Sequence, residues 1–134
     1  MEAPVNPPNQ KTILIVDDDP GILALVSGIL SRDYNVLMAI SGQDGLDKSR
    51  AHKGDIDLLL SDFQMPDLSG VDLATKITHD RPHIKVLLMS GFPEGMLVLN
   101  EGWHFLAKPF IPSQLRTLVS GLVTPNLLPS RFGA

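Results

Sequence analysis

Carboxylates, a hydroxyl and an ammonium stand directly after four short apolar runs of this chain. They are Asp17, Asp18 and Asp19 after 12–16, Asp62 after 56–61, Ser90 after 84–89 and Lys108 after 103–107. A carboxylate can attack phosphorus and several can hold a cation, while an ammonium and a hydroxyl can bind phosphoryl oxygens. The residue types at these positions therefore fit a phosphoryl-transfer site.

The elements that position these side chains can be predicted from the apolar pattern. Short runs rich in Ile, Val and Leu that alternate with amphipathic segments are typical of buried parallel strands separated by helices. The predicted strands are 12–16, 35–39, 56–60, 84–89 and 103–107, and the predicted helices begin at or near Pro20, Ser41, Ser69, Met96 and Pro112. Five such βα units predict a doubly wound five-stranded parallel sheet, (βα)5, in a three-layer α/β sandwich. Because ligands of such sheets bind beyond the carboxyl ends of the strands, the polar side chains should meet at one rim.

Start signals and apolar periodicity define the helices. Ser41 and Ser69 each have an aspartate three residues on, which is a weak capping box, whereas Gly45 disfavours the second helix. Proline and glycine leave room for only one or two turns of a fourth helix around residues 96–99. The residues expected on buried helix faces are Ile22, Leu25, Val26, Ile29, Leu30, Val71, Ala74, Ile77, Leu115, Leu118, Val119 and Leu122.

Composition limits the class of protein. The chain has 134 residues, a net charge of −4 and no cysteine, which predicts one domain in a reducing, cytoplasmic location. Its Lys and Arg residues are scattered singly and no apolar run approaches the length of a membrane span, so we expect neither direct nucleic-acid binding nor a membrane segment. The expected organisation is a disordered lead over 1–11, the domain over 12–123 and a tail over 124–134.

The predicted sheet places strands 12–16 and 56–60 side by side, which would bring Asp17, Asp18 and Asp62 close together. Like charges at such distances ionise at a high cost unless a cation joins them. Oxygen ligands suit Mg²⁺, and the four histidines share no ligand spacing. We therefore expect a magnesium site.

Four segments carry a resemblance to a known family: ILIVDDDP (13–20), LSDFQMP (60–66) with Gly70, MSG (89–91) and FLAKPF (105–110). In their order and spacing they make the chain similar to the receiver domain of two-component response regulators over residues 11–123, a flavodoxin-like fold. The stretch between Ser90 and Lys108 is shorter than usual, and this compact form resembles receivers attached to hybrid histidine kinases.

The resemblance implies a switch rather than an enzyme. Asp62 would take a phosphoryl group from a histidine kinase or a histidine phosphotransfer protein, and the phosphorylated domain would bind a downstream protein partner. Asp18, Asp62 and the backbone carbonyl of Gln64 would bind Mg²⁺ directly, with Asp17 acting mostly through metal-bound water. The domain would catalyse only its own phosphotransfer and a slow autodephosphorylation. Because many relatives dimerise, a homodimer stays open.

The resemblance also implies roles for residues around the phosphoryl group. Ser90 would hydrogen-bond the group, Lys108 would pair with it, and Phe105 would be the aromatic rotamer switch. The bond from Lys108 to Pro109 would be cis. Gln64 and Phe92 would border the path of the attacking water, and we expect the ring of Phe92 to shield the phosphoryl group.

Other interpretations compete with these roles. The acids 17–19 could cap the first helix, as we expect for Asp19, and Phe105 could simply be a packing residue. A flavodoxin-type cofactor binder would need a phosphate-binding loop where the three acids lie. A haloacid-dehalogenase-type phosphohydrolase would need a hydroxyl residue where Pro20 and Gly21 follow. A degenerate receiver that only binds partners would have lost the chemical residues, which are all present here.

Overall fold

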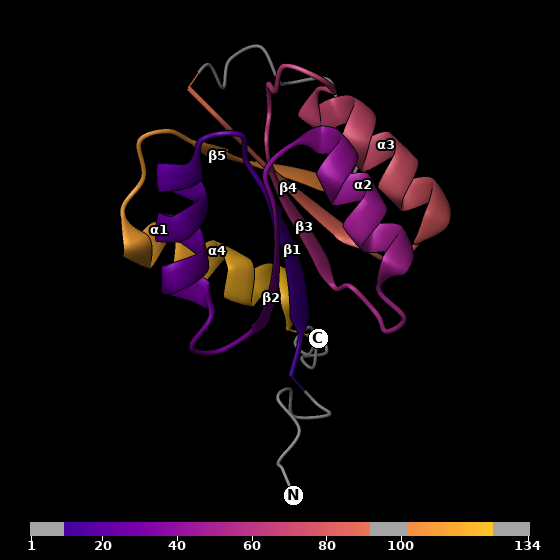
Figure 1. The fold of residues 1–134 in the computed structure, drawn as a ribbon. Coiled ribbons are helices and arrows are strands. Elements are labelled where there is room, and N and C mark those ends of the chain that lie inside the picture. The colour runs from indigo at the N-terminus through magenta and orange to yellow at the C-terminus, as the bar shows by residue number, and fades with distance from the viewer. Residues whose placement is uncertain (1–9, 92–101, 125–134) are drawn as a thin grey trace, which may run out of the picture.

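The computed structural model describes residues 10–91 and 102–124 as a five-stranded parallel sheet between two layers of helices. The elements are β1 Thr12–Val16, α1 Pro20–Leu30, β2 Asn35–Ala39, α2 Gly42–Ala51, β3 Leu58–Asp62, α3 Gly70–Asp80, β4 Lys85–Ser90, β5 Trp103–Ala107 and α4 Pro112–Val123. The strand order is β2-β1-β3-β4-β5, with α1 and α4 on one face and α2 and α3 on the other (Figure 1). The predicted sheet and sandwich are confirmed. The short helix predicted around 96–99 lies outside the described residues, so α4 is the last of the predicted helices.

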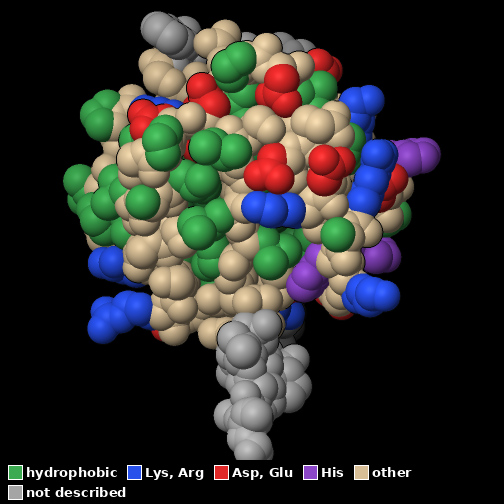
Figure 2. All heavy atoms as spheres, in the orientation of Figure 1, with side chains coloured by type: hydrophobic (Ala, Val, Ile, Leu, Met, Phe, Trp, Pro, Cys, Tyr) green, Lys and Arg blue, Asp and Glu red, His purple; other side chains and the backbone are tan. Residues whose placement is uncertain are grey.

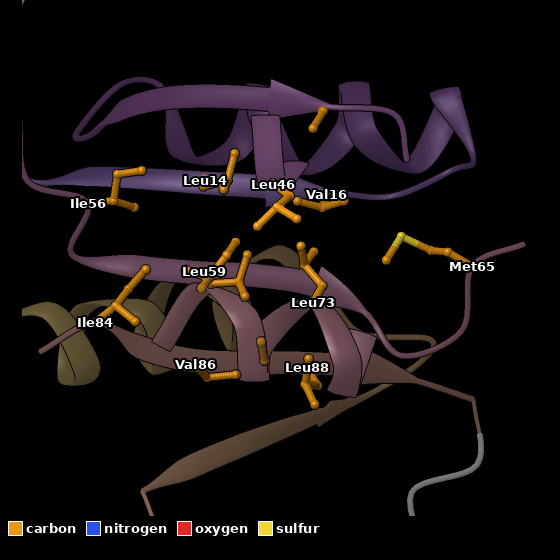
Figure 3. Packing of buried hydrophobic residues seen from close by; sticks show 13 residues of the cluster. Leu14, Val16, Leu46, Ile56, Leu59, Met65, Leu73, Ile84, Val86 and Leu88 are labelled. Carbon is orange, nitrogen blue, oxygen red and sulfur yellow. The ribbon is translucent and has the colours of Figure 1, made fainter. Parts of the chain in front are cut away.

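Two hydrophobic clusters, one on each face of the sheet, hold the layers together. The central strands bury both faces because successive side chains point to opposite sides. Leu14, Leu59 and Leu88 pack beneath α2 and α3 (Figure 3). Ile15 and Leu60 belong to the second cluster, which also contains residues of α1 and α4. The central strands therefore form a rigid platform whose carboxyl ends carry the polar residues.

The ends of two strands differ from the prediction. The third strand is Leu58–Asp62 rather than 56–60, and the fourth is Lys85–Ser90 rather than 84–89. Ile56 and Ile84 are buried although they precede the strands, so the apolar run begins before the ladder does. Each ladder also continues into the polar residues at the rim, which hydrophobicity alone does not assign to a strand.

The buried faces of two helices also differ in detail. The sequence predicts Leu25 in the core, but this residue is 53% exposed. Val71 is only half-buried, and Leu73 is fully buried beside Ala74 and Ile77. The reason in α1 is that the helix contains no charged residue, so its apolar periodicity does not separate the inner from the outer face.

Helix α2 packs closely against the sheet at Gly45, the glycine that disfavours a helix in the sequence analysis. A Cβ atom on Gly45 would stand 2.8 Å from a methyl carbon of Val16, so the packing of α2 on β1 requires a residue without a side chain. At the start of α2, the Ser41 hydroxyl accepts a hydrogen bond from the Asp44 amide at 3.0 Å. The Asp44 carboxylate accepts from the amide of Ile40 rather than that of Ser41, so the capping box is only half formed.

Strand β2 is an outer strand of the sheet. The Lys48 ammonium on α2 donates a hydrogen bond of 2.6 Å to the backbone carbonyl of Met38 in β2.

Among the helices of the described ranges, none has the length and apolar content needed to cross a membrane.

Candidate functional site

The register of the strands brings the predicted residues to one rim. Val16 pairs with Ser61, so the next residues along the chain, Asp17 and Asp62, lie beside each other at the ends of β1 and β3. Asp62 is paired with Met89, which places Ser90 one residue beyond it on β4. Lys108 follows β5 directly, and its amide donates to the Ser90 carbonyl at 2.8 Å.

Three carboxylates form the centre of this rim. Asp17, Asp18 and Asp62 each offer an oxygen within 4.8 Å of the others. Asp17 is buried and Asp18 exposed, while the side chain of Asp62 is 14% exposed. One oxygen of Asp17 accepts from the Asp19 amide at 2.9 Å. Its other oxygen is buried without a hydrogen-bond partner within the described part of the chain. Burial raises the pKa of Asp17, although the Asp19 amide and the Lys108 charge oppose the shift.

Lys108 is the cation of the site. Its ammonium donates a hydrogen bond of 2.7 Å to Asp62 and lies 3.6 Å from the buried oxygen of Asp17. Burial lowers the pKa of Lys108, but the hydrogen bond to Asp62 and the attraction of Asp17 outweigh burial, and the pKa is raised. The side chain therefore keeps its charge at neutral pH. The peptide bond from Lys108 to Pro109 is cis, as the resemblance implied.

The donor set fits a small divalent cation. Three carboxylates face one ammonium, which leaves net negative charge and a buried oxygen of Asp17 that accepts no hydrogen bond. Oxygen-only ligands at the end of a rigid sheet suit Mg²⁺ better than zinc, which favours imidazole and thiolate ligands. Asp17, Asp18 and Asp62 are the side chains of the described residues that could hold such an ion.

The other predicted residues lie around this centre. Ser90 is buried at the end of β4, and Gln64 is exposed in the loop that follows β3. Phe105 is half-buried in β5, where it packs against the cluster beneath α2 and α3. Asp19 caps α1 as predicted, since its carboxylate accepts from the amides of Gly21 and Ile22 at 2.8 and 3.3 Å. Phe92 lies outside the described residues.

Sequence reasoning missed one residue of the loop after β3. The Asp67 carboxylate accepts hydrogen bonds from the amides of Gly42 and Gln43 at 3.1 and 2.9 Å. These amides begin α2, 25 and 24 residues earlier in the chain. No local spacing could have indicated this contact, because it exists only after the sheet brings α2 beside the loop.

Comparison with known proteins agrees with this geometry. Residues 13–120 match the family model described as the response regulator receiver domain. The chain belongs to this family. Over 117 residues it is 32% identical to the sensor kinase CckA of Brucella abortus, covering 84% of this receiver chain and 12% of that kinase. The receiver therefore spans about an eighth of the length of that relative.

Solved structures of receivers are similar in fold. The receiver domain of the hybrid histidine kinase CckA has a TM-score of 0.74 at 30% identity, covering 84% of this chain and 99% of that one. The response regulator TrrA of Thermotoga maritima, in complex with Mg²⁺-BeF, has a TM-score of 0.75 at 28% identity, with coverage of 84% and 99%. Family membership favours a two-component receiver over a flavodoxin-type cofactor binder or a haloacid-dehalogenase-type hydrolase.

Proposed function

We propose that this receiver accepts a phosphoryl group on Asp62 from a phosphohistidine of a histidine kinase or a histidine phosphotransfer protein. The observation that carries the proposal is the position of Asp62 at the carboxyl end of β3. There its carboxylate touches the Lys108 ammonium at 2.7 Å and lies among the oxygens of Asp17 and Asp18. The match to the receiver family and the similarity to CckA support the same partner class.

The reaction is a displacement at phosphorus. An oxygen of Asp62 attacks the phosphorus atom and the new O–P bond forms as the N–P bond of the phosphohistidine breaks. The imidazole leaves with the electron pair of that bond and takes up a proton from water. The Lys108 ammonium, which now bonds Asp62, moves its hydrogen bond to a phosphoryl oxygen, and the Ser90 hydroxyl bonds another.

A magnesium ion held by Asp17, Asp18, Asp62 and the carbonyl of Gln64 would supply positive charge against the carboxylates and the incoming phosphoryl group. The TrrA receiver in complex with Mg²⁺-BeF supports this cofactor. In the protein itself, the buried oxygen of Asp17 that accepts no hydrogen bond supports it, because a buried polar atom without a hydrogen bond is costly and the Lys108 ammonium at 3.6 Å compensates only in part.

The domain, over 12–123, acts as a switch in the cytoplasm and loses its phosphoryl group slowly by autodephosphorylation. Ser90 draws toward the new phosphoryl group and Phe105, half-buried two residues before the end of β5, changes its rotamer. These changes alter the surface presented to a downstream protein partner, or to a second copy of the chain.

Labelling with a small phosphodonor tests the proposal. Incubation with acetyl phosphate and Mg²⁺ should give one acid-labile and base-labile modification, mapped to Asp62. Asp62→Asn should abolish it, whereas the control Asp55→Asn, an exposed aspartate before β3, should leave it unchanged. Equal labelling of the wild type and Asp62→Asn contradicts the proposal, and steady turnover of phosphate esters that depends on Asp17 indicates a hydrolase instead.

A further inference from the structure

The loop that follows the acceptor is closed at its base. The Phe63 amide donates to the carbonyl of Met89 and the Gly70 amide donates to the carbonyl of Phe63, both at 2.8 Å. Between these two hydrogen bonds the chain makes an excursion over residues 64–69. Gln64, whose carbonyl is the proposed metal ligand, begins that excursion and is exposed. Its position therefore depends on what holds the rest of the loop.

Two contacts hold the middle of this loop. Met65 is 9% exposed and reaches from the loop toward the cluster beneath α2 and α3 (Figure 3). Asp67 has an exposed carboxylate that spans the first two amides of α2, Gly42 and Gln43. A carboxylate at a helix N-terminus gains from the free amides and from the helix dipole. The same hydrogen bonds, with that of Gln43 foremost, lower the pKa of Asp67.

Helix α2, whose first amides bind Asp67, is held by contacts at both of its ends. A Cβ atom on Gly42 would stand 2.5 Å from the Cβ atom of Leu68, so the start of α2 touches the loop directly. At the other end, the Arg81 guanidinium donates to the backbone carbonyls of Ser49, His52 and Gly54 at 2.8 to 2.9 Å. Helix α2 is therefore a firm anchor for the loop.

We infer that Asp67 is a positioning residue for the magnesium site. By fastening the loop to α2, its carboxylate fixes the backbone at Gln64 and holds the carbonyl ready for the ion. This inference rests on the proposed function. Residues that orient metal ligands typically change metal affinity about tenfold or more when they are removed.

Magnesium binding to the full chain tests the inference. Isothermal titration calorimetry should show about tenfold weaker Mg²⁺ binding for Asp67→Ala and a smaller loss for Asp67→Asn, which keeps one acceptor oxygen. Labelling by acetyl phosphate should need correspondingly more Mg²⁺ for half-maximal rate, yet reach the wild-type rate at saturating Mg²⁺. The matched controls are Asp33→Ala and Asp33→Asn, which remove the same charge from an exposed position after α1.

The outcomes separate positioning from simple helix capping. A cap that only stabilises α2 would lower the melting temperature and leave the Mg²⁺ concentration for half-maximal binding unchanged, which overturns the inference. If Asp67→Ala does not fold, Asp67→Asn decides by the same measurement. Amide hydrogen exchange should also become faster at Gly42 and Gln43 in both variants. A wild type that binds no Mg²⁺ would overturn the proposed metal site, whereas equal binding by the wild type and both Asp67 variants overturns this inference alone.

Discussion

Charge balance dominates at the scale of single residues. Asp17, Asp18 and Asp62 place three carboxylates within 4.8 Å, and Lys108 neutralises only part of their charge. Asp17 is the most strongly affected of the three, because it is only 1% exposed and burial is the main cause of its raised pKa. A divalent cation bound among these carboxylates would relieve the repulsion, so metal binding would stabilise the fold.

Addition of Mg²⁺ should therefore raise the free energy of unfolding. At ten times the dissociation constant, the gain for one site is about 1.4 kcal/mol. Asp18→Asn should blunt the gain, because it removes one ligand at an exposed position. Thermal denaturation across a Mg²⁺ series measures both, and Ca²⁺-free NaCl at matched ionic strength controls for screening. A melting temperature that does not respond to Mg²⁺ would contradict the metal site.

The sequence predicts those residues of the site whose position depends only on the order of the strands. Asp17, Asp62, Ser90 and Lys108 all follow apolar runs, and parallel strands necessarily bring such residues to one rim. The contact between Asp67 and α2 could not be predicted in this way. The partners of Asp67 are backbone amides, which every sequence has, and they lie on an element 24 residues away.

At the scale of elements, the start of α3 lies directly against the end of β3. A Cβ atom on Gly70 would overlap the backbone carbonyl oxygen of Asp62. Neither backbone can move aside without shifting Asp62 or the start of α3. Gly28 in α1 is a contrasting case, because a Cβ atom there would meet nothing within 4 Å.

Two glycine substitutions should therefore have opposite effects. Gly70→Ala should lower the free energy of unfolding by about 1–3 kcal/mol, as overpacking does, and slow the labelling of Asp62. Gly28→Ala should raise it by about 0.5–1 kcal/mol, because alanine favours a helix interior. Urea denaturation measures both changes. Equal stability of the two variants would contradict the close contact between Gly70 and the backbone carbonyl of Asp62.

The elements themselves were mostly predictable, and the exceptions have physical reasons. Apolar runs identified all five strands, yet they misplaced the start of β3 because Ile56 is buried before the ladder begins. Gly45 argued against α2, although the close packing on Val16 requires glycine there. In both cases tertiary packing decided what local propensity could not.

At the scale of the whole molecule, the two helical layers differ in charge. Helix α1 has no charged residue and α4 contains only Arg116, whereas α2 and α3 carry charges of both signs. Figure 2 shows hydrophobic side chains gathered over α1 and charged side chains over α2. A hollow of about 400 Å³ beside α1 is lined by Ile22, Leu25, Lys108, Pro109 and Phe110. Since Lys108 also contacts Asp62, a protein bound there would lie next to Asp62.

The phosphohistidine donor should therefore dock over α1. Leu25→Asp should raise the donor concentration needed for half-maximal transfer about tenfold, as loss of an apolar interface residue does. Labelling by acetyl phosphate should not change, since that small molecule needs no docking surface. Leu25→Met is the control. The measurement uses a histidine phosphotransfer protein that labels the wild type, and equal slowing with both donors would place the defect in the site instead.

The hydrogen bond from Lys48 to the outer strand has a consequence for crowded conditions. An open sheet edge offers free carbonyls and amides on which the strand of another molecule can add, which is a route to aggregation. The Lys48 ammonium occupies the carbonyl of Met38 and puts a positive charge beside it. A foreign strand would have to displace that ammonium before it could pair. A side chain remote from the chemistry thus helps to keep the protein dispersed at the concentrations at which signalling partners must find it.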